Sequence, residues 1–208
     1  IVMLSSLGWS QCDEGYTEID GECYYQGDID VLQIFIDNST ETINMDMDVD
    51  SSGVIEVLEL GINYWEDGRI TYLSCNYLGL SGDIPQNIGN LISLTYLSLK
   101  SNQLTGEIPG SIVNLVILTH LNLFNNNLTG EIPSNIGNLT NLTFLGLSNN
   151  DLNGGIPNSI GNLTNVWYFD IFGNNINGQI PESIGGMSNV SVLYLDHNQL
   201  TGEIPQSI

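Results

Sequence analysis

The sequence has very few basic residues. Lys and Arg together number 2 against 24 Asp and Glu, which gives a formal net charge of −22 at pH 7. Binding to nucleic acid or to an anionic membrane surface requires lysine and arginine opposite the phosphates. No stretch reaches the roughly 18–20 consecutive apolar residues of a membrane-spanning helix. We therefore expect no nucleic-acid partner and no membrane insertion.

Histidine is equally scarce. The chain has 2 His, His120 and His197, and neither has a nucleophile or an acid at a spacing that indicates a catalytic site. The sequence also carries no cofactor-binding motif. We therefore expect a non-catalytic protein without a cofactor.

The 3 cysteines favour one structural disulfide. Cys12 and Cys23 enclose ten residues in a segment poor in apolar residues, where a disulfide would close a loop. Cys75 falls at an inward position of the repeats described below and is expected to be a buried thiol. Pairing of Cys75 with Cys23 is the alternative. A disulfide, low Lys and Arg content and several Asn-x-Ser/Thr sequons agree with export from the cell.

Proline is rare but strictly periodic. The 6 prolines follow one another every 24 residues, so the chain contains an internal repeat. They are Pro85, Pro109, Pro133, Pro157, Pro181 and Pro205.

Each part of the repeat has a structural role that can be stated physically. In the unit 94–117, Leu94, Leu97 and Leu99 follow the pattern L-x-x-L-x-L, which is typical of a short half-buried strand. An asparagine follows each strand, and its amide can satisfy backbone groups left bare where the chain turns. A glycine and then an Ile-Pro pair enforce a bend, and Ile112 and Leu115 face inward from a short helical return. The asparagines, expected to form a buried ladder, are Asn102, Asn126, Asn150, Asn174 and Asn198.

This unit resembles the plant-type leucine-rich repeat, L-x-x-L-x-L-x-x-N-x-L-x-G-x-I-P. The resemblance implies an α/β solenoid: a right-handed coil with a parallel β-sheet on the concave face, short 3₁₀ or helical turns on the convex side, and an N-terminal cap. It also implies recognition of a protein, peptide or glycan outside the cell. In the first repeat, Cys75 replaces a strand leucine and Leu78 replaces the asparagine.

The chain divides into an N-terminal segment and the repeats. Residues 1–69 hold 16 of the 24 acidic residues and are expected to form an acidic cap, as open repeat arrays require. In it we expect the Cys12/Cys23 loop, a helix at about 28–39 behind an Asp30 N-cap, and a strand at about 54–60. The repeats are expected at 70–93, 94–117, 118–141, 142–165, 166–189 and, as a partial unit, 190–208.

One acidic stretch of the cap has a metal-like spacing. Asp46, Asp48 and Asp50 are spaced like the start of a calcium loop, but glycine falls at the eighth position and no glutamate stands at the twelfth. A solvated acidic loop is the favoured interpretation, with calcium binding as the alternative.

The outward positions between the strand leucines define the candidate site, because equivalent residues of successive coils form columns on the sheet. The first column is Tyr72, Tyr96, His120, Phe144, Tyr168 and Val192; the second is Ser74, Ser98, Asn122, Gly146, Asp170 and Tyr194; the third is Asn76, Lys100, Phe124, Ser148, Phe172 and Asp196. Small residues at 146 and 148 predict a notch in the fourth coil, between Phe124 and Phe172. The predicted ligand-binding residues are Tyr72, Tyr96, His120, Asn122, Phe124, Phe144, Gly146, Tyr168, Asp170 and Phe172.

The sequence leaves four interpretations of what the solenoid surface does. The rings can simply stabilise the sheet by cross-strand stacking, or they can anchor a protein, peptide or glycan in a secreted or cell-surface recognition module. The sequence stops at Ile208 inside a repeat without a polar cap, so either it is a fragment of a longer array or its end docks onto another subunit; a filament or surface layer built by such end-to-end contacts is the alternative function. Ice binding by the threonine column of Thr71, Thr95, Thr119 and Thr143 is weaker, since the column ends at Trp167.

Overall fold

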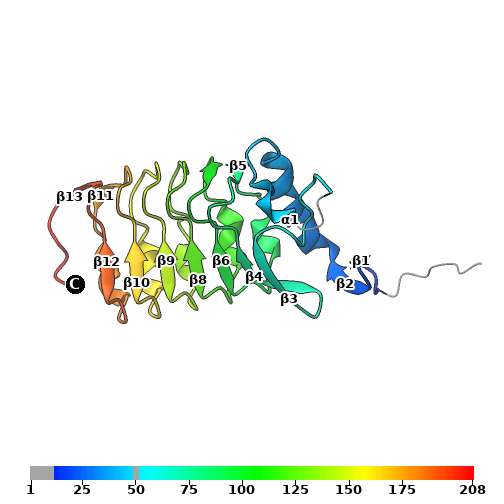
Figure 1. Ribbon diagram of the computed structural model, residues 1–208. Helices are drawn as coiled ribbons and strands as arrows, with labels where there is room; N and C mark the ends of the chain where they lie inside the picture. The colour runs from blue at the N-terminus through cyan, green and yellow to red at the C-terminus, as the bar shows by residue number, and fades with distance from the viewer. Residues whose placement is uncertain (1–11, 49–51) are drawn as a thin grey trace, which may run out of the picture.

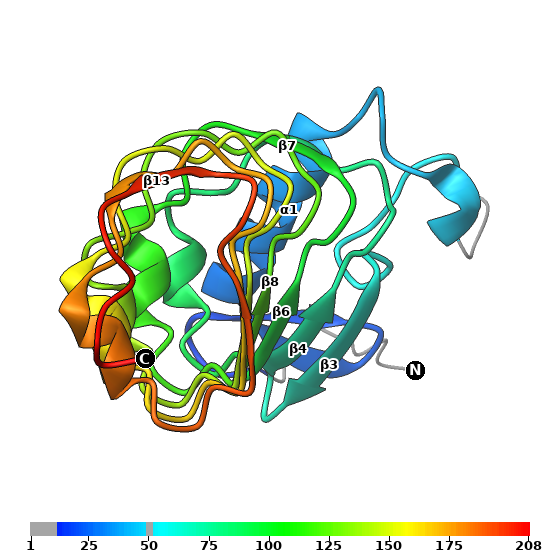
Figure 2. The ribbon, with the colours of Figure 1, turned by 90° about the vertical axis from the view of Figure 1, so that its left-hand side faces the viewer.

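The repeats wind into a solenoid in which each coil lies beside the next along one axis (Figure 1). The structure is a computed structural model that describes residues 12–48 and 52–208. Figure 2 shows the coils in projection, with the main sheet on one side, 3₁₀ turns on the opposite side and short strands on the edge between them. None of the helices in these ranges is long and apolar enough to cross a membrane.

The main sheet has seven strands in the order β12-β10-β9-β8-β6-β4-β3. Each repeat contributes one strand, and parallel neighbours are paired 24 residues apart, as in Tyr72 with Tyr96 and Tyr96 with His120. Because paired residues are separated by one full repeat, equivalent side chains form the predicted columns on the outer face of the sheet, which we call the concave face. The strands are β3 (Ile62–Glu66), β4 (Arg69–Ser74), β6 (Tyr96–Ser98), β8 (His120–Asn122), β9 (Phe144–Gly146), β10 (Tyr168–Asp170) and β12 (Val192–Tyr194).

The rest of each coil carries the chain back to the next strand. The short edge strands are β5 (Ser81–Asp83), β7 (Gln103–Thr105), β11 (Asn177–Gln179) and β13 (Gln199–Thr201). The 3₁₀ helices on the convex side are η2 (Ile88–Asn90), η3 (Gly110–Asn114), η4 (Ile136–Asn138), η5 (Asn158–Asn162) and η6 (Glu182–Gly186). Between strand and return, the glycine three residues before each proline has φ between 67 and 80°. Only glycine adopts this left-handed region without strain, which is why the repeat keeps it there.

The interior is a continuous column of aliphatic side chains. In the second coil, Leu94, Leu97, Leu99, Leu104 and Leu115 are all fully buried. A single coil cannot bury these side chains by itself, so the core forms only when coils stack.

The five strand-end asparagines connect neighbouring coils. Each donates its amide N–H groups to the carbonyl three residues earlier and to one 27 residues earlier, and its Oδ1 accepts the backbone N–H of the residue 22 positions earlier. For Asn126 these partners are Leu123 O at 3.1 Å, Leu99 O at 3.0 Å and Leu104 N at 3.2 Å. The bonds of the other four are the same. Asn102 and Asn198, near the two ends, are half-buried, whereas the three between them are buried.

The N-terminal end of the solenoid is covered by an α-helix and two hairpins (Figure 1). Helix α1 (Gln26–Asn38) packs against β5 and η2 and buries Val31, Leu32, Phe35 and Ile36. It begins before Asp30, which therefore is not its N-cap; Tyr25 occupies that position without a side-chain cap. A short 3₁₀ helix, η1 (Met45–Met47), follows.

The strand predicted at about 54–60 was wrong. Ile55, Val57 and Leu60 are buried, but the backbone forms turns, one of them closed by Glu59 N to Glu56 O at 3.0 Å. The edge of the sheet beside β4 is instead occupied by β3, which pairs antiparallel to β4. Because β3 occupies that edge, residues 54–60 have no strand to pair with. Their alternating apolar side chains are buried beneath a loop, not in a sheet.

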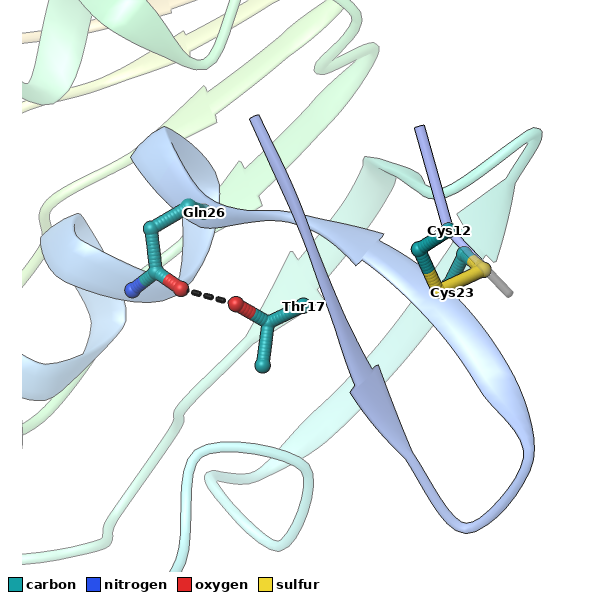
Figure 3. The surroundings of a disulfide bond; sticks show 4 residues. All are labelled: Cys12, Thr17, Cys23 and Gln26. Carbon is teal, nitrogen blue, oxygen red and sulfur yellow. Dashed lines mark hydrogen bonds between the residues drawn. A yellow bond between two sulfur atoms is a disulfide. The ribbon is translucent and has the colours of Figure 1, made fainter. Parts of the chain in front are cut away.

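A disulfide joins Cys12 to Cys23 beside the hairpin of β1 (Tyr16–Ile19) and β2 (Glu22–Tyr25) (Figure 3). A hydrogen bond from Thr17 Oγ1 to Gln26 Oε1 ties the same hairpin to the first turn of α1. Cys75 is a free, buried thiol, so the alternative pairing of Cys75 with Cys23 was wrong.

One buried ion pair links the cap to the first repeat. Asp28 of α1 is fully buried and accepts from Arg69 Nε at 2.9 Å, from an Arg69 terminal nitrogen at 3.0 Å and from Ile70 N at 3.0 Å. Arg69 also donates to Asn90 O at 3.1 Å and lies over the Tyr25 ring. Helix α1, strand β4 and helix η2 therefore meet at a single charge pair.

Candidate functional site

The first outward column forms a continuous stack of aromatic rings on the concave face. Ring centroids are 4.2 Å apart from Tyr72 to Tyr96, from Tyr96 to His120 and from His120 to Phe144, and 4.5 Å apart from Phe144 to Tyr168. The planes are within 2 to 13° of parallel. We call these five residues the ring ladder. Because parallel strands lie about 4.8 Å apart, rings at equivalent positions stack almost without tilting.

Stacking determines what the ring ladder can offer a ligand. Tyr96, His120 and Phe144 each have a ring over both faces, and all five rings are only partly exposed. A sugar stacks on an open ring face, and both faces of each of these three rings are occupied. The ladder instead presents ring edges, which carry partial positive charge and suit carbonyl oxygens and aliphatic groups.

His120 is held neutral inside this stack. Burial among the rings lowers the pKa of His120 to about 4. Its Nε2 is buried and has no hydrogen-bond partner among the described residues. A proton on that nitrogen would thus have no acceptor among the described residues.

We expect the stability of the protein to fall as the pH is lowered through the interval between about 6.5 and 4. In that interval the unfolded chain binds a proton at His120 and the folded chain does not, so acid favours unfolding. The loss should reach about 1–2 kcal/mol, since the ring retains some contact with water. The H120F variant should lack this component in urea titrations at pH 7 and pH 4.5, whereas equal pH dependence of both proteins would contradict it.

A polar network around Asp170 joins residues of all three columns. Its Oδ2 accepts from Ser148 Oγ at 2.7 Å and from Tyr168 Oη at 3.1 Å, and its Oδ1 accepts from Phe172 N at 2.9 Å. Asp170 is buried, with 8% of its surface exposed. Its hydrogen bonds hold β10 and the following turn, which leaves little of the carboxylate for a ligand.

A hollow of about 210 Å³ opens on the concave face at the fourth coil. Gly146 forms part of its floor: a Cβ there would lie 2.9 Å from Phe144 Cε1 and 3.2 Å from Asn122 Oδ1. Sites for whole small molecules usually measure about 300–1,000 Å³, so this one is of a size for a single side chain of a larger ligand. The hollow is lined by Lys100, Asn122, Phe124, Phe144, Gly146, Ser148, Tyr168 and Asp170.

The sequence-based list of binding residues differs from this lining at both ends. Phe172 does not line the hollow, because its ring packs against His197 with centroids 4.5 Å apart. Tyr72, Tyr96 and His120 belong to the ring ladder outside the hollow. Lys100 and Ser148 line it but were not among the predicted ligand-binding residues, although both stand next to Phe124 in the third column.

The threonine column does not form an ice-binding surface of free hydroxyl groups. Thr95, Thr119 and Thr143 each donate Oγ1 to the carbonyl of the threonine one coil earlier, at 2.8 to 3.0 Å. The hydroxyl hydrogens are therefore used within the solenoid and cannot match a water lattice.

The acidic stretch of the cap is only partly described, since Asp50 lies outside the described residues. Asp48 accepts through its carboxylate from Ser52 N at 3.0 Å and from Gly53 N at 2.8 Å, so both of its oxygens are engaged by backbone N–H groups. Across residues 12–48 and 52–208, no three His, Cys, Asp or Glu side chains are grouped to hold a metal ion.

Two family models match this chain. Residues 41–173 match the family model described as a leucine-rich repeat region, and residues 165–187 and 189–208 match the leucine-rich repeat model. The chain belongs to the leucine-rich repeat family. The first match runs from the cap through the first four coils into the fifth, and includes the strand, asparagine and Gly-x-Ile-Pro positions described above.

Solved structures of leucine-rich repeat receptors are similar to this chain. The ectodomain of the Arabidopsis thaliana receptor kinase GASSHO1/SCHENGEN3, in complex with Casparian strip integrity factor 2, is 34% identical over 85% of this chain and 22% of its own, with a TM-score of 0.73. The plant peptide hormone receptor RGFR1, in complex with RGF2, is 36% identical over 66% of this chain and 22% of its own, with a TM-score of 0.65.

Another similar structure is closer in length. The SOBIR1 ectodomain from Arabidopsis thaliana is 29% identical over 86% of this chain and 97% of its own, with a TM-score of 0.68. The chain thus spans about a fifth of the two receptors solved with their ligands and nearly all of SOBIR1. No curated protein matches the sequence. None of the three structures is described as a filament, so the filament hypothesis gains no support from them.

Proposed function

We propose that this leucine-rich repeat chain is an extracellular, non-catalytic recognition module that binds a peptide on its concave face. The observation that carries the proposal is the hollow beside the ring ladder, which is of a size for one side chain. The peptide would lie across the strands, with its backbone over the ring edges and one apolar or aromatic side chain in the hollow.

Two features favour a peptide over a glycan. The interior rings of the ladder have both faces covered, so they offer no stacking platform for a sugar. Their edges, together with the amide of Asn122, suit the carbonyl oxygens of a peptide backbone. The receptors solved with Casparian strip integrity factor 2 and with RGF2 support the same class of ligand and an extracellular location.

The proposal is tested by affinity selection from a synthetic library of random dodecapeptides on the immobilised protein, with recovered peptides identified by mass spectrometry. We expect wild-type protein to retain a related set of peptides. The G146L variant should bind them at least tenfold more weakly, because the leucine occupies the hollow that the peptide side chain would fill.

The matched control is G110L. Gly110 opens η3 on the convex side, and a Cβ there meets nothing within 4 Å, so the same substitution adds a leucine far from the hollow. Circular dichroism should show both variants folded, and F124A provides a second change in the hollow if G146L is disrupted. Retention of no peptide by wild-type protein, or equal affinity of wild-type, G146L and F124A proteins, would contradict the proposal.

A further inference from the structure

The two basic side chains of this chain have different surroundings. The sequence has one arginine and one lysine, Arg69 and Lys100. Arg69 forms an ion pair with the buried Asp28 of the cap. Among the described residues, Arg69 forms an ion pair with Asp28 and His197 contacts Asp196, and neither contact involves Lys100. Within residues 12–48 and 52–208, Lys100 therefore has no carboxylate at ion-pair distance, although the sequence carries 24 acidic residues.

Aromatic rings hold Lys100 in place at the edge of the hollow. Its Nζ lies 5.3 Å from the ring centroid of Tyr77 and 5.4 Å from that of Phe124, within the range of cation–π attraction. Its backbone N donates to Asn76 Oδ1 at 2.9 Å, which fixes the start of the side chain. A long, flexible lysine is thus ordered before any ligand arrives, which lowers the entropic cost of using it for binding.

The carboxylates of the outward columns are already engaged, including that of Asp170, which lines the same hollow as Lys100. In the three outward columns they are Asp170 of the fifth coil and Asp196 of the sixth, whereas Lys100 belongs to the second. Asp170 accepts three hydrogen bonds, and Asp196 Oδ2 lies 3.0 Å from His197 Nδ1. Among the described residues, no carboxylate therefore lies within the 4.0 Å of an ion pair with Lys100, and the two carboxylates of its own surface are held by other partners.

We propose that Lys100 is a specificity-determining residue that binds a carboxylate of the peptide ligand, next to the side chain that enters the hollow. This inference rests on the proposed function and adds the chemistry of the ligand: an acidic side chain, or the terminal carboxylate, beside an apolar or aromatic residue. The positive edges of the ring ladder extend the same preference for oxygen atoms along the face.

The selection on random dodecapeptides also tests this pairing, in two libraries that differ only in a free or an amidated carboxyl terminus. We expect retained peptides to carry Asp or Glu at a constant offset from an apolar residue, and the amidated library shows whether a side chain or the terminus supplies the carboxylate. K100M should bind a selected peptide about tenfold more weakly, K100R should retain most of the affinity, and K100E should select Lys or Arg at the same offset.

A double-mutant cycle localises the effect. Replacing the selected acidic residue of the peptide by its amide should cost wild-type protein about as much as K100M does, and should cost K100M little more. Q179E, which makes the net charge more negative by the same amount on an exposed position of the flank, is the control for long-range electrostatics and should bind like wild-type protein.

The outcomes separate the two proposals. Peptides retained without an acidic preference, and bound by K100M within twofold of wild type, overturn the role of Lys100 and leave peptide recognition standing. Retention of no peptide by wild-type protein overturns both. Lys100-dependent binding of polygalacturonate in place of peptides overturns the peptide assignment, since an acidic glycan would then be the ligand.

Discussion

Replacing Asp28 by leucine should lower the free energy of unfolding by about 3–5 kcal/mol, the usual cost of breaking a buried ion pair by removing one partner. The variant leaves the Arg69 guanidinium and the Ile70 amide without their acceptor inside the interface between α1 and β4. R69M should be costly for the same reason, because it strands the fully buried Asp28. The double variant D28L/R69M should lose less than the sum of the two, since it leaves no unpaired charge.

The measurement is urea unfolding of variants that keep a single tryptophan, either Trp65 in the β3–β4 hairpin or Trp167 in the fifth coil. Coils of a repeat array contact only their neighbours, so loss of the cap contact should be reported first by Trp65. D30N, on the exposed side of α1, is the control and should change stability by less than about 0.5 kcal/mol. Stability of D28L within that same range would show that the ion pair does not hold the cap in place.

Replacing Asn126 by leucine should lower the free energy of unfolding by about 3–5 kcal/mol. The amide satisfies Leu99 O and Leu123 O and accepts from Leu104 N, all in the buried interior. Each unsatisfied buried backbone group costs about 1–3 kcal/mol, and the costs are not fully additive. Leucine has about the same size but can make none of these bonds.

The adjacent Asn127 supplies the control for this substitution. It is exposed, so N127L should leave stability nearly unchanged in the same urea titration. N102L should fall between the two, because Asn102 makes the same bonds at a half-buried position near the end of the array. Equal stability of N126L and N127L would mean that water or backbone movement replaces the amide at little cost.

The repeat itself could be predicted because its signals are local and multiplied. A proline every 24 residues, with leucine, asparagine and glycine at fixed offsets, specifies a strand, a turn and a return in every coil. Once the period is known, the pairing of Tyr72 with Tyr96 and of Tyr96 with His120 follows, because equivalent positions of stacked coils must face each other. The columns of the concave face are thus a consequence of the 24-residue periodicity alone.

The cap lacked such repetition, and there sequence reasoning failed at the strand expected at 54–60. Its alternation of apolar residues was real, since Ile55 and Val57 are buried, but burial under a loop and burial in a sheet produce the same pattern. A better signal lay a few residues later: Asp67-Gly68 between β3 and β4 is the dipeptide that favours a tight hairpin turn. Both residues have positive φ, 49 and 71°.

What the sequence determined by itself is the solenoid, its 24-residue register and the identity of every residue in the three outward columns. What only the tertiary structure decided is how those residues use their surfaces. Rings of the ladder whose centroids are 4.2 Å apart cover one another's faces. The Phe172 ring packs against His197, and Lys100 Nζ lies near the rings of Tyr77 and Phe124. Periodicity fixes where each Cβ stands, whereas the direction and exposure of a side chain depend on contacts with neighbouring coils, and these exist only after the chain has folded.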